Sequence, residues 1–392
     1  MKIHQKKKIR SFVNHYKNNT IPFFKKFMIS KNGIILNCVK EDGSLLTKNR
    51  YSWSIGRGLY SLCYSIEQKL ISKNYVSVMD STYKYCLKRF LSNLNNIPYS
   101  VSYDGKTIDN NKSDFTSYFI CIGFLKANYL YNKLDLKNIN LDVTEKLISK
   151  TLINLMYKKK FNHYPLDLPS YSKSLSKKMC LINFLWELYL VYNNKDYLKI
   201  AKTEANSMLN NLVKYNLITE NGLNKKNDIF CPGHISEAVW FSIEVITENK
   251  DIKHLTKNKI LFLSKVANSF EKVLNISWDK ENGGLFHNLK FDKNGDLLIL
   301  NSIKTWWSAV ELFVALSYFA KYKIYIQINN NCGLSVVYQY LNKFYFSKKN
   351  FDWIQKYNIT HTKSDEGVGL PVRDFFHYPR AAIRLNNLLN NI

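Results

Sequence analysis

The sequence has little proline and little glycine, with 7 prolines and 14 glycines in 392 residues. Both residue types mark turns, so a protein built from many short strands needs more of them. Long apolar runs are also missing, since no window approaches the roughly 18 uncharged apolar residues that span a membrane. These absences favour a mainly helical chain, and we expect no membrane partner.

Cysteine is sparse as well. The 7 cysteines form no C-x-x-C pair and no spacing typical of metal ligands. An odd, dispersed set in a long chain is typical of reduced thiols in a cytosol. The N-terminus is basic but lacks the apolar segment of a signal peptide. We therefore expect a cytoplasmic protein with no metal site.

Acidic residues are few, with 30 Asp and Glu against 57 Lys and Arg, for a net charge of +27. A positive charge of this size is typical of proteins that bind nucleic acid. The lysines are scattered singly or in pairs, however, with short runs only in "QKKKIR" and "YKKKF", and a phosphate-tracking surface needs clustering on one face. We expect no nucleic-acid partner, and a basic N-terminal tail at residues 1–12.

Apolar residues make up 46% of the chain, which is ample for a large core. Apolar side chains recur every three or four residues over 75–91, which predicts a helix. Residues 179–213 are typical of two helices joined at Asn193 to Lys195. Further apolar-faced helices are predicted over 306–322 and 380–389.

Short polar breaks with turn residues separate these helices. Gly283-Gly284 and Asn294-Gly295 bracket "LFHNLKF", which predicts a small hairpin between helices. Helix after helix, joined by loops with glycines and aromatic residues, suggests a closed ring of helical hairpins. No Pro/Gly/Ser-rich linker divides the chain, so we expect a single domain over 1–392.

The stretch "CPGHISEAVW" places a histidine and a glutamate near the start of a predicted helix. His234 and Glu237 are three residues apart and therefore share one face. A carboxylate beside an imidazole fixes its tautomer and strengthens it as a base, whereas a helix N-terminus favours neutral imidazole. The alternatives are an ordinary capped helix with a satisfied core histidine, or a metal site, which the lack of H-E-x-x-H disfavours.

Three further motifs carry candidate site residues. In "FFHYPRAAIRL", His377 stands where the chain enters the last helix and Arg380 lies in its first turn. In "KTWWSAVELFVAL", Trp306 and Trp307 are adjacent and Glu311 follows Trp307 by four positions. Tryptophan faces stack on sugar rings and an inward glutamate binds hydroxyls, although both also occur in ordinary packing.

The fourth motif is "SWSIGRGLYSL". Arg57 is flanked by glycines, whose backbone lets the guanidinium approach a ligand. The stretch lacks the G-x-G-x-x-G of a dinucleotide loop.

Taken together and in this order, these motifs and "GGLFHNLKFDKNG" resemble the N-acylglucosamine 2-epimerase family, which includes renin-binding protein and cellobiose 2-epimerases. The resemblance implies an all-α fold, an (α/α)6 barrel with short β-hairpin insertions in the loops at one end. Those loops would build a pocket for a small sugar. The resemblance implies that the protein needs no cofactor. It also leaves open that ATP is an allosteric activator and that the protein forms a homodimer.

The resemblance also implies a mechanism. The sugar ring opens, one histidine removes the C2 proton, and a second histidine returns a proton on the opposite face of an enediolate-like intermediate. The implied acid–base pair is His234 and His377. Glu237 would orient His234, and Arg57 would stabilise the carbonyl oxygen. The implied substrate-binding residues are Trp306, Trp307, Glu311 and Arg380.

One departure bears on the substrate. Cellobiose 2-epimerases and related isomerases carry a histidine at the start of a mid-chain helix, where this sequence has Met179 and Cys180. That favours interconversion of N-acylglucosamine and N-acylmannosamine. The alternatives are an aldose–ketose isomerase, another sugar enzyme on the same barrel such as a glycoside hydrolase, or a non-catalytic renin-binding-like or polyanion-binding protein.

Overall fold

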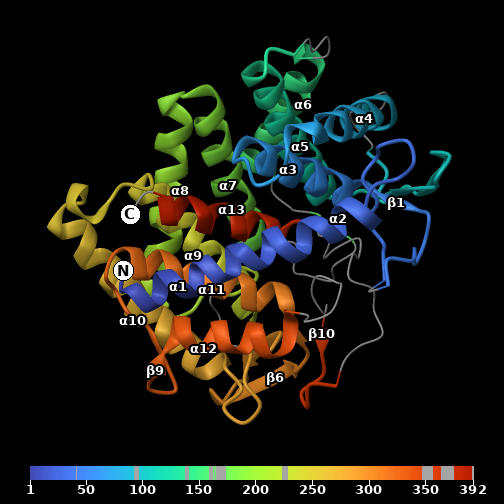
Figure 1. Cartoon of the computed structure of the whole chain (residues 1–392). Coiled ribbons are helices and arrows are strands. Elements are labelled where there is room, and N and C mark those ends of the chain that lie inside the picture. Colours follow the sequence, from blue (N-terminus) through green and yellow to red (C-terminus); the bar gives the residue numbers. More distant parts are fainter. Residues whose placement is uncertain are drawn as a thin grey trace.

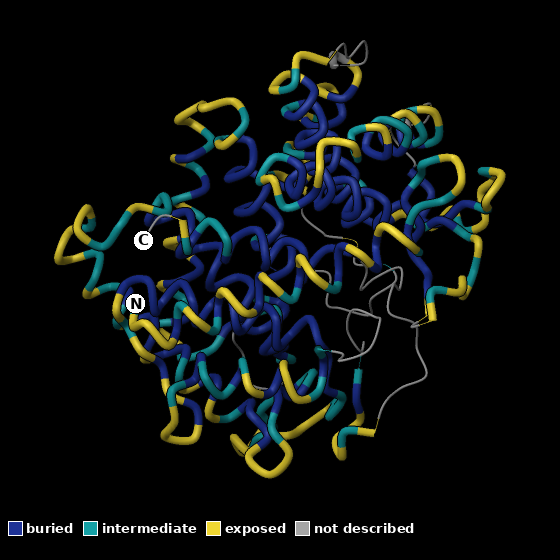
Figure 2. The backbone as a smooth tube through the Cα atoms, in the orientation of Figure 1, coloured by how far each residue is buried: buried dark blue, intermediate teal, exposed yellow. Residues whose placement is uncertain are grey.

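The computed structural model describes residues 1–40, 42–91, 97–136, 141–158, 162, 164, 174–222, 228–346, 356–362 and 375–390. Helices dominate this part of the chain, and the elements follow one another as helical pairs (Figure 1). Buried residues gather where the helices pack together, and exposed ones lie on the connecting loops and on the outward faces of outer helices (Figure 2).

Six helices form an inner ring. Each contacts the next along the chain, and the last contacts the first, which closes the ring. They are buried on nearly all sides, as expected for helices whose sequences are apolar all round. The inner helices are α3 (Ser52–Glu67), α5 (Asp114–Lys133), α7 (Leu175–Tyr192), α9 (Pro232–Thr247), α11 (Trp306–Lys321) and α13 (His377–Asn390).

The helices between them in sequence form an outer layer. Helix α8 shows the pattern of this layer, because its buried residues recur at three- and four-residue steps from Leu198 to Leu212. The outer helices are α1 (Ile3–His15), α4 (Val76–Cys86), α6 (Leu141–Tyr157), α8 (Lys195–Tyr215), α10 (Lys257–Ser277) and α12 (Gly333–Tyr340). The two layers make the (α/α)6 barrel that we predicted.

Short helical segments extend or precede the outer helices. They are η1 (Tyr16–Thr20), α2 (Ile21–Phe27), η2 (Lys73–Tyr75), η3 (Leu87–Leu91), η4 (Ile252–His254) and η5 (Leu341–Tyr345). Among the helices of the described residues, none combines the length and the apolar character that crossing a bilayer requires.

The small antiparallel sheets lie mostly in the connections that lead into inner helices. One joins β1 (Arg50–Tyr51), β2 (Ser100–Val101) and β3 (Thr107–Asp109), and another joins β4 (Ile229–Phe230), β5 (Asn288–Phe291) and β6 (Leu297–Asn301). A third pairs β7 (Lys304–Thr305) with β10 (Lys356–Tyr357). The hairpin predicted around "LFHNLKF" is confirmed as β5–β6. The hairpins were expected at one end of the barrel, and one hairpin departs from this. Strands β8 (Gln327–Ile328) and β9 (Asn331–Cys332) connect α11 to α12 at the opposite end.

The junction predicted at Asn193 is confirmed. Asn193 has φ of +52° and ends α7, and the side chain of Asn194 caps α8 by accepting from the N–H of Asp196. The prediction of a tail at residues 1–12 is wrong. Helix α1 begins at Ile3 and packs on α13 with Ile9 and Phe12 buried, because its apolar face completes the outer layer.

The glycines around Arg57 have a different role from the one expected. They lie inside α3, and a Cβ on Gly56 would stand 2.5 Å from the carbonyl of Phe119 in α5. Gly123 of α5 faces the backbone of Gly56 in the same way. Gly56 and Gly123 therefore let α3 and α5 pack backbone to backbone, and Arg57 lies on a helix rather than in a flexible loop.

Candidate active site

A cavity of about 190 Å³ opens at the end of the barrel where the inner helices begin. Every inner helix contributes to it from its first two turns: Arg57 from α3, Phe119 from α5, Met179 from α7, His234 from α9, Trp307 from α11 and His377 from α13. The N-terminal ends of all six helices therefore face one space. Their partial positive charges favour an anion or a developing negative charge there.

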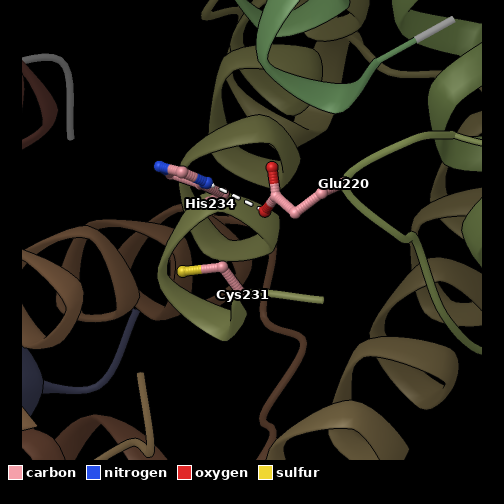
Figure 3. Close-up of side chains that lie close together, drawn as sticks. All are labelled: Glu220, Cys231 and His234. Atoms are coloured by element: carbon pink, nitrogen blue, oxygen red, sulfur yellow. Dashed lines mark hydrogen bonds and ion pairs between the residues drawn. The ribbon is translucent and has the colours of Figure 1, made fainter. Parts of the chain in front are cut away.

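His234 is held by a glutamate that the sequence did not single out. Its Nδ1 lies 2.9 Å from Oε1 of Glu220, and both side chains are shown in Figure 3. Glu220 stands in the turn after α8, where its N–H donates to the carbonyl of Ile229 and its carbonyl accepts from Leu175. The carboxylate fixes the proton on Nδ1, which leaves Nε2 as the reactive nitrogen.

Glu237 does not orient His234, and that expectation is corrected. Its carboxylate accepts from Arg380 at 2.5 Å. Residues three apart on a helix share a face, but Glu237 lies one turn deeper in the barrel than His234. At that depth its carboxylate pairs with the guanidinium of Arg380 from α13 instead of with the imidazole.

The pKa of the His234 imidazole is raised although the side chain is largely buried. Desolvation lowers the pKa of this imidazole, but the charge of Glu220 and the hydrogen bond to it raise the pKa, with help from Glu237 and Glu311. The net result is a pKa above the ordinary histidine value. The raised pKa increases the share of His234 that carries a proton near neutral pH.

His377 is paired with Glu311. Its Nδ1 lies 2.7 Å from Oε1 of Glu311, and this oxygen also accepts from Arg380 at 2.7 Å. The other carboxylate oxygen, Oε2, accepts from the indole N–H of Trp240 at 2.6 Å. Glu311 is fully buried and contributes nothing to the described lining of the cavity. The structure thus places it behind His377, where it orients the imidazole, rather than in the position expected of a residue that binds sugar hydroxyls.

The pKa of His377 is shifted the other way. Burial lowers it well below the ordinary value, and the charges of Arg57, Arg380 and His234 lower it further against the opposing charge of Glu237. The hydrogen bond to Glu311 does not reverse this, because desolvation is the largest cause of the shift. His377 is therefore neutral near pH 7, with its Nε2 lone pair free to accept a proton.

Arg380 was expected to hold the sugar. Its guanidinium lines the cavity but is 1% exposed and bridges Glu237 and Glu311. The structure therefore shows it first as the cation that compensates two buried carboxylates. Oxygen and nitrogen donors of Glu237, Glu311 and His377 lie within 4.8 Å of one another, a spacing that suits a metal, but Arg380 already occupies their centre.

The tandem tryptophans have separate places. Trp307 lines the cavity, with its ring centroid 5.1 Å from that of His234 and 5.4 Å from that of His377. Trp306 is buried and packs edge-on against His377 at 5.9 Å. Trp307 therefore offers a face between the two imidazoles, and Trp306 supports one of them from behind.

Arg57 is set among aromatic rings. The centre of its guanidinium lies 4.0 Å from the ring centroid of Phe119, 4.7 Å from Phe376 and 4.8 Å from Trp53. These rings hold the side chain at the cavity and keep water from its sides. A cation in such surroundings interacts strongly with a nearby anion.

Sequence patterns missed Glu220, because it precedes His234 by 14 positions and belongs to none of the motifs. Cys231 and His287 also line the cavity without having been expected there. Met179 and Cys180 line the cavity too. The positions at which this sequence departs from the cellobiose 2-epimerases therefore border the candidate site.

Residues 35–381 match the sequence profile of the N-acylglucosamine 2-epimerase (GlcNAc 2-epimerase) family. The fold is similar to that of cellobiose 2-epimerase from Bacillus thermoamylovorans B4167, with 15% identity, a TM-score of 0.72, and coverage of 97% of this chain and 99% of that chain. Cellobiose 2-epimerase from Spirochaeta thermophila DSM 6192 gives 12% identity, a TM-score of 0.75 and coverage of 99% and 98%. A D-mannose isomerase gives 16% identity, a TM-score of 0.71 and coverage of 96% and 97%. A comparison with curated protein sequences finds no match.

Proposed function

The chain belongs to the N-acylglucosamine 2-epimerase family, and on that premise we propose that it interconverts N-acylglucosamine and N-acylmannosamine by moving a proton at C2. One observation carries the proposal. His234 and His377 border one cavity, both pack against Trp307, and each is held through Nδ1 by a buried glutamate. Inversion at a single carbon needs two such groups on opposite faces.

In the proposed reaction the sugar binds in its open form, whose C1 aldehyde makes the C2 proton acidic. One imidazole takes that proton at Nε2, and the C–H electron pair forms the C1=C2 bond while O1 becomes an oxyanion. The other imidazolium then gives its proton to C2 from the opposite side. The aldehyde re-forms with inverted C2, and no external oxidant or reductant is needed.

Two features would stabilise the enediolate-like intermediate. Arg57 places a desolvated cation at the cavity, where it can pair with O1. The N-terminal ends of the six inner helices add positive potential from fixed dipoles. Both are present before the reaction starts, so no reorganisation is required when the charge develops.

The opposite directions of the two pKa shifts support resting roles for the two imidazoles. Neutral His377 is the base for the epimer whose C2 proton faces it, and protonated His234 is the acid. The reverse reaction exchanges the roles, and the pair carries one proton in total at the start of either direction. The family resemblance alone left this assignment open.

Met179 and Cys180 support an N-acyl substrate. They present a thioether and a thiol at the cavity wall, where the disaccharide epimerases and isomerases that the sequence resembles carry a histidine. An apolar wall suits the methyl group of an acetamide.

The hydrolase alternative requires two carboxylates that face each other across the pocket. Within the described lining, Glu237 is the acidic residue, and Arg380 neutralises it. That arrangement gives the hydrolase alternative no support. The proposed reaction uses no cofactor, and activation by ATP is checked by adding the nucleotide to the assay.

The test is an NMR assay in D2O with N-acetylmannosamine, N-acetylglucosamine, mannose and cellobiose as separate substrates. We expect deuterium at C2 of the epimeric product with the two N-acetyl sugars and little turnover of the others. Preferred turnover of cellobiose, or conversion of mannose to a ketose, would overturn the substrate assignment. Epimerisation without incorporation of solvent deuterium would contradict the two-histidine mechanism.

A further inference from the structure

Three side chains of different ligand types meet at the edge of the cavity. Glu220, Cys231 and His234 each offer a donor atom, and these atoms all lie within 4.8 Å of one another (Figure 3). Cys231 is the residue before α9, and His234 lies in the first turn of that helix. Glu220 comes from the turn after α8, so the cluster exists only once the barrel has folded.

The three donors are those that zinc prefers. Thiolate, imidazole and carboxylate bind Zn²⁺ at about 2.0–2.3 Å, so tetrahedral ligands lie roughly 3.3–3.6 Å apart. Nδ1 of His234 and Oε1 of Glu220 stand 2.9 Å apart and would spread by a few tenths of an ångström. The donor atoms of every other pair lie within 4.8 Å, so none would have to close by more than about 1.5 Å.

The surroundings also suit such an ion. Cys231 and His234 both line the cavity, so a fourth coordination position would face solvent or a ligand. Glu220 and Cys231 are each 1% exposed, which keeps competing water from the other side. Cys231 stands at the N-cap of α9, where hydrogen bonds from the backbone N–H groups of His234 and Gly233 lower the pKa of its thiol. Burial and the charge of Glu220 outweigh them and raise that pKa, so the thiolate forms only when a metal displaces the proton.

We propose that Glu220, Cys231 and His234 form a zinc site whose occupancy inhibits the protein reversibly. Binding makes one bond from the metal to each of Sγ, Nδ1 and a carboxylate oxygen. It releases the thiol proton of Cys231 and the Nδ1 proton of His234 to solvent, with no change of oxidation state. An imidazole bound to a metal no longer exchanges protons near neutral pH, and this inhibitory effect rests on the proposed function of His234.

The site contrasts with the other cluster of potential ligands. There Arg380 already compensates the carboxylates of Glu237 and Glu311, so a cation would have to displace a guanidinium. At the Glu220 cluster a metal would replace only the hydrogen bond between His234 and Glu220. Zinc should therefore choose the Glu220 cluster.

The test uses Co²⁺ as a spectroscopic probe of the purified full-length protein. We expect sulfur-to-cobalt charge-transfer absorption in the near ultraviolet that one equivalent of Zn²⁺ abolishes. C231S should remove the band, and E220Q should weaken metal binding by at least about tenfold. Serine is a favoured N-cap, so C231S should fold, which circular dichroism verifies.

Cys180→Ser is the matched control, because Cys180 lines the same cavity but shares no such cluster among the described residues. It should keep the band and the zinc affinity. A band that survives in C231S, or one that is lost in C180S, overturns the site.

The second readout is epimerisation with and without Zn²⁺, each variant compared with its own metal-free rate. Inhibition that disappears in C231S supports the regulatory role, and inhibition that persists there overturns it. Absence of epimerisation with every sugar would refute the proposed function, whereas the cobalt spectrum would still decide the metal site.

Discussion

The two histidine–glutamate pairs share one hydrogen-bond pattern and differ in their surroundings. In each pair Nδ1 faces a buried carboxylate, at 2.9 Å for His234 and 2.7 Å for His377. Yet the pKa of His234 is raised and that of His377 is lowered. At His234 the charge of Glu220 and the hydrogen bond to it outweigh desolvation. At His377 desolvation is the largest cause, and the charges of Arg57, Arg380 and His234 add to it.

The comparison teaches that a carboxylate partner does not by itself make a histidine more basic. What counts is the charge that remains after the partner's other contacts, together with desolvation. Two opposed shifts within one cavity give an acid and a base at the same pH.

The largest effect is expected from removing either imidazole. H234Q and H377Q should each lower epimerisation by about 10³-fold or more, since one face of C2 loses its proton-transfer group. Each variant should still exchange the C2 proton of one epimer with D2O, without inversion. That epimer should differ between the two variants, and NMR of each pure epimer measures it.

Unaltered folding by circular dichroism is the control for both histidine variants. Inversion that continues in both would show that the two imidazoles are not the acid–base pair.

The second effect concerns Glu311→Gln. Glu311 has three polar partners, so the change leaves Arg380 with one carboxylate and should cost about 3 kcal/mol of unfolding free energy. The turnover number should fall about 100-fold as His377 loses its orientation. The pKa of His377 should fall further, which moves the acid limb of the pH–rate profile to lower pH.

Denaturant unfolding and the pH profile check these outcomes together. A fall in activity with unchanged stability would show that Glu311 does not compensate Arg380.

The third effect concerns Glu220→Gln, which removes the charge that raises the pKa of His234. The pKa should fall, so His234 loses its proton at lower pH and the alkaline limb moves down. Activity near pH 7 should decrease about tenfold, less than for E311Q, because Glu220 supports one site residue rather than a network. An alkaline limb that stays in place would exclude His234 as the acid.

The smallest effect is expected in the pH dependence of stability. The folded pKa of His234 is raised, so its contribution is complete below the unfolded value of about 6.5 and is lost as pH rises through the folded pKa. The folded pKa of His377 is lowered, so its contribution is complete above about 6.5 and is lost as pH falls.

Unfolding free energies measured from pH 5 to 9 check these signs. H234Q should flatten the alkaline side and H377Q the acid side, and the reverse pattern would contradict the assignment.

Much of the barrel was predictable because its signals are local. The asparagine that ends α7, the turn residues of the β5–β6 hairpin and the helical spacing in outer helices all act within a few positions. The placement of α1 was not predictable in this way. Its basic face resembles a solvated tail, and its apolar face finds a partner only when α13 is in place.

Local sequence signals placed His234, Trp307 and His377 at or near predicted helix starts, and the structure puts all three at the cavity. Folding put Arg57 on a helix and buried Trp306 and Glu311 behind the cavity wall. Folding also set the partners of the two imidazoles. Glu220 reaches His234 from another hairpin, and Arg380 takes Glu237 away from it. Burial and ion pairing depend on contacts between distant segments, and these contacts set the charge of each imidazole.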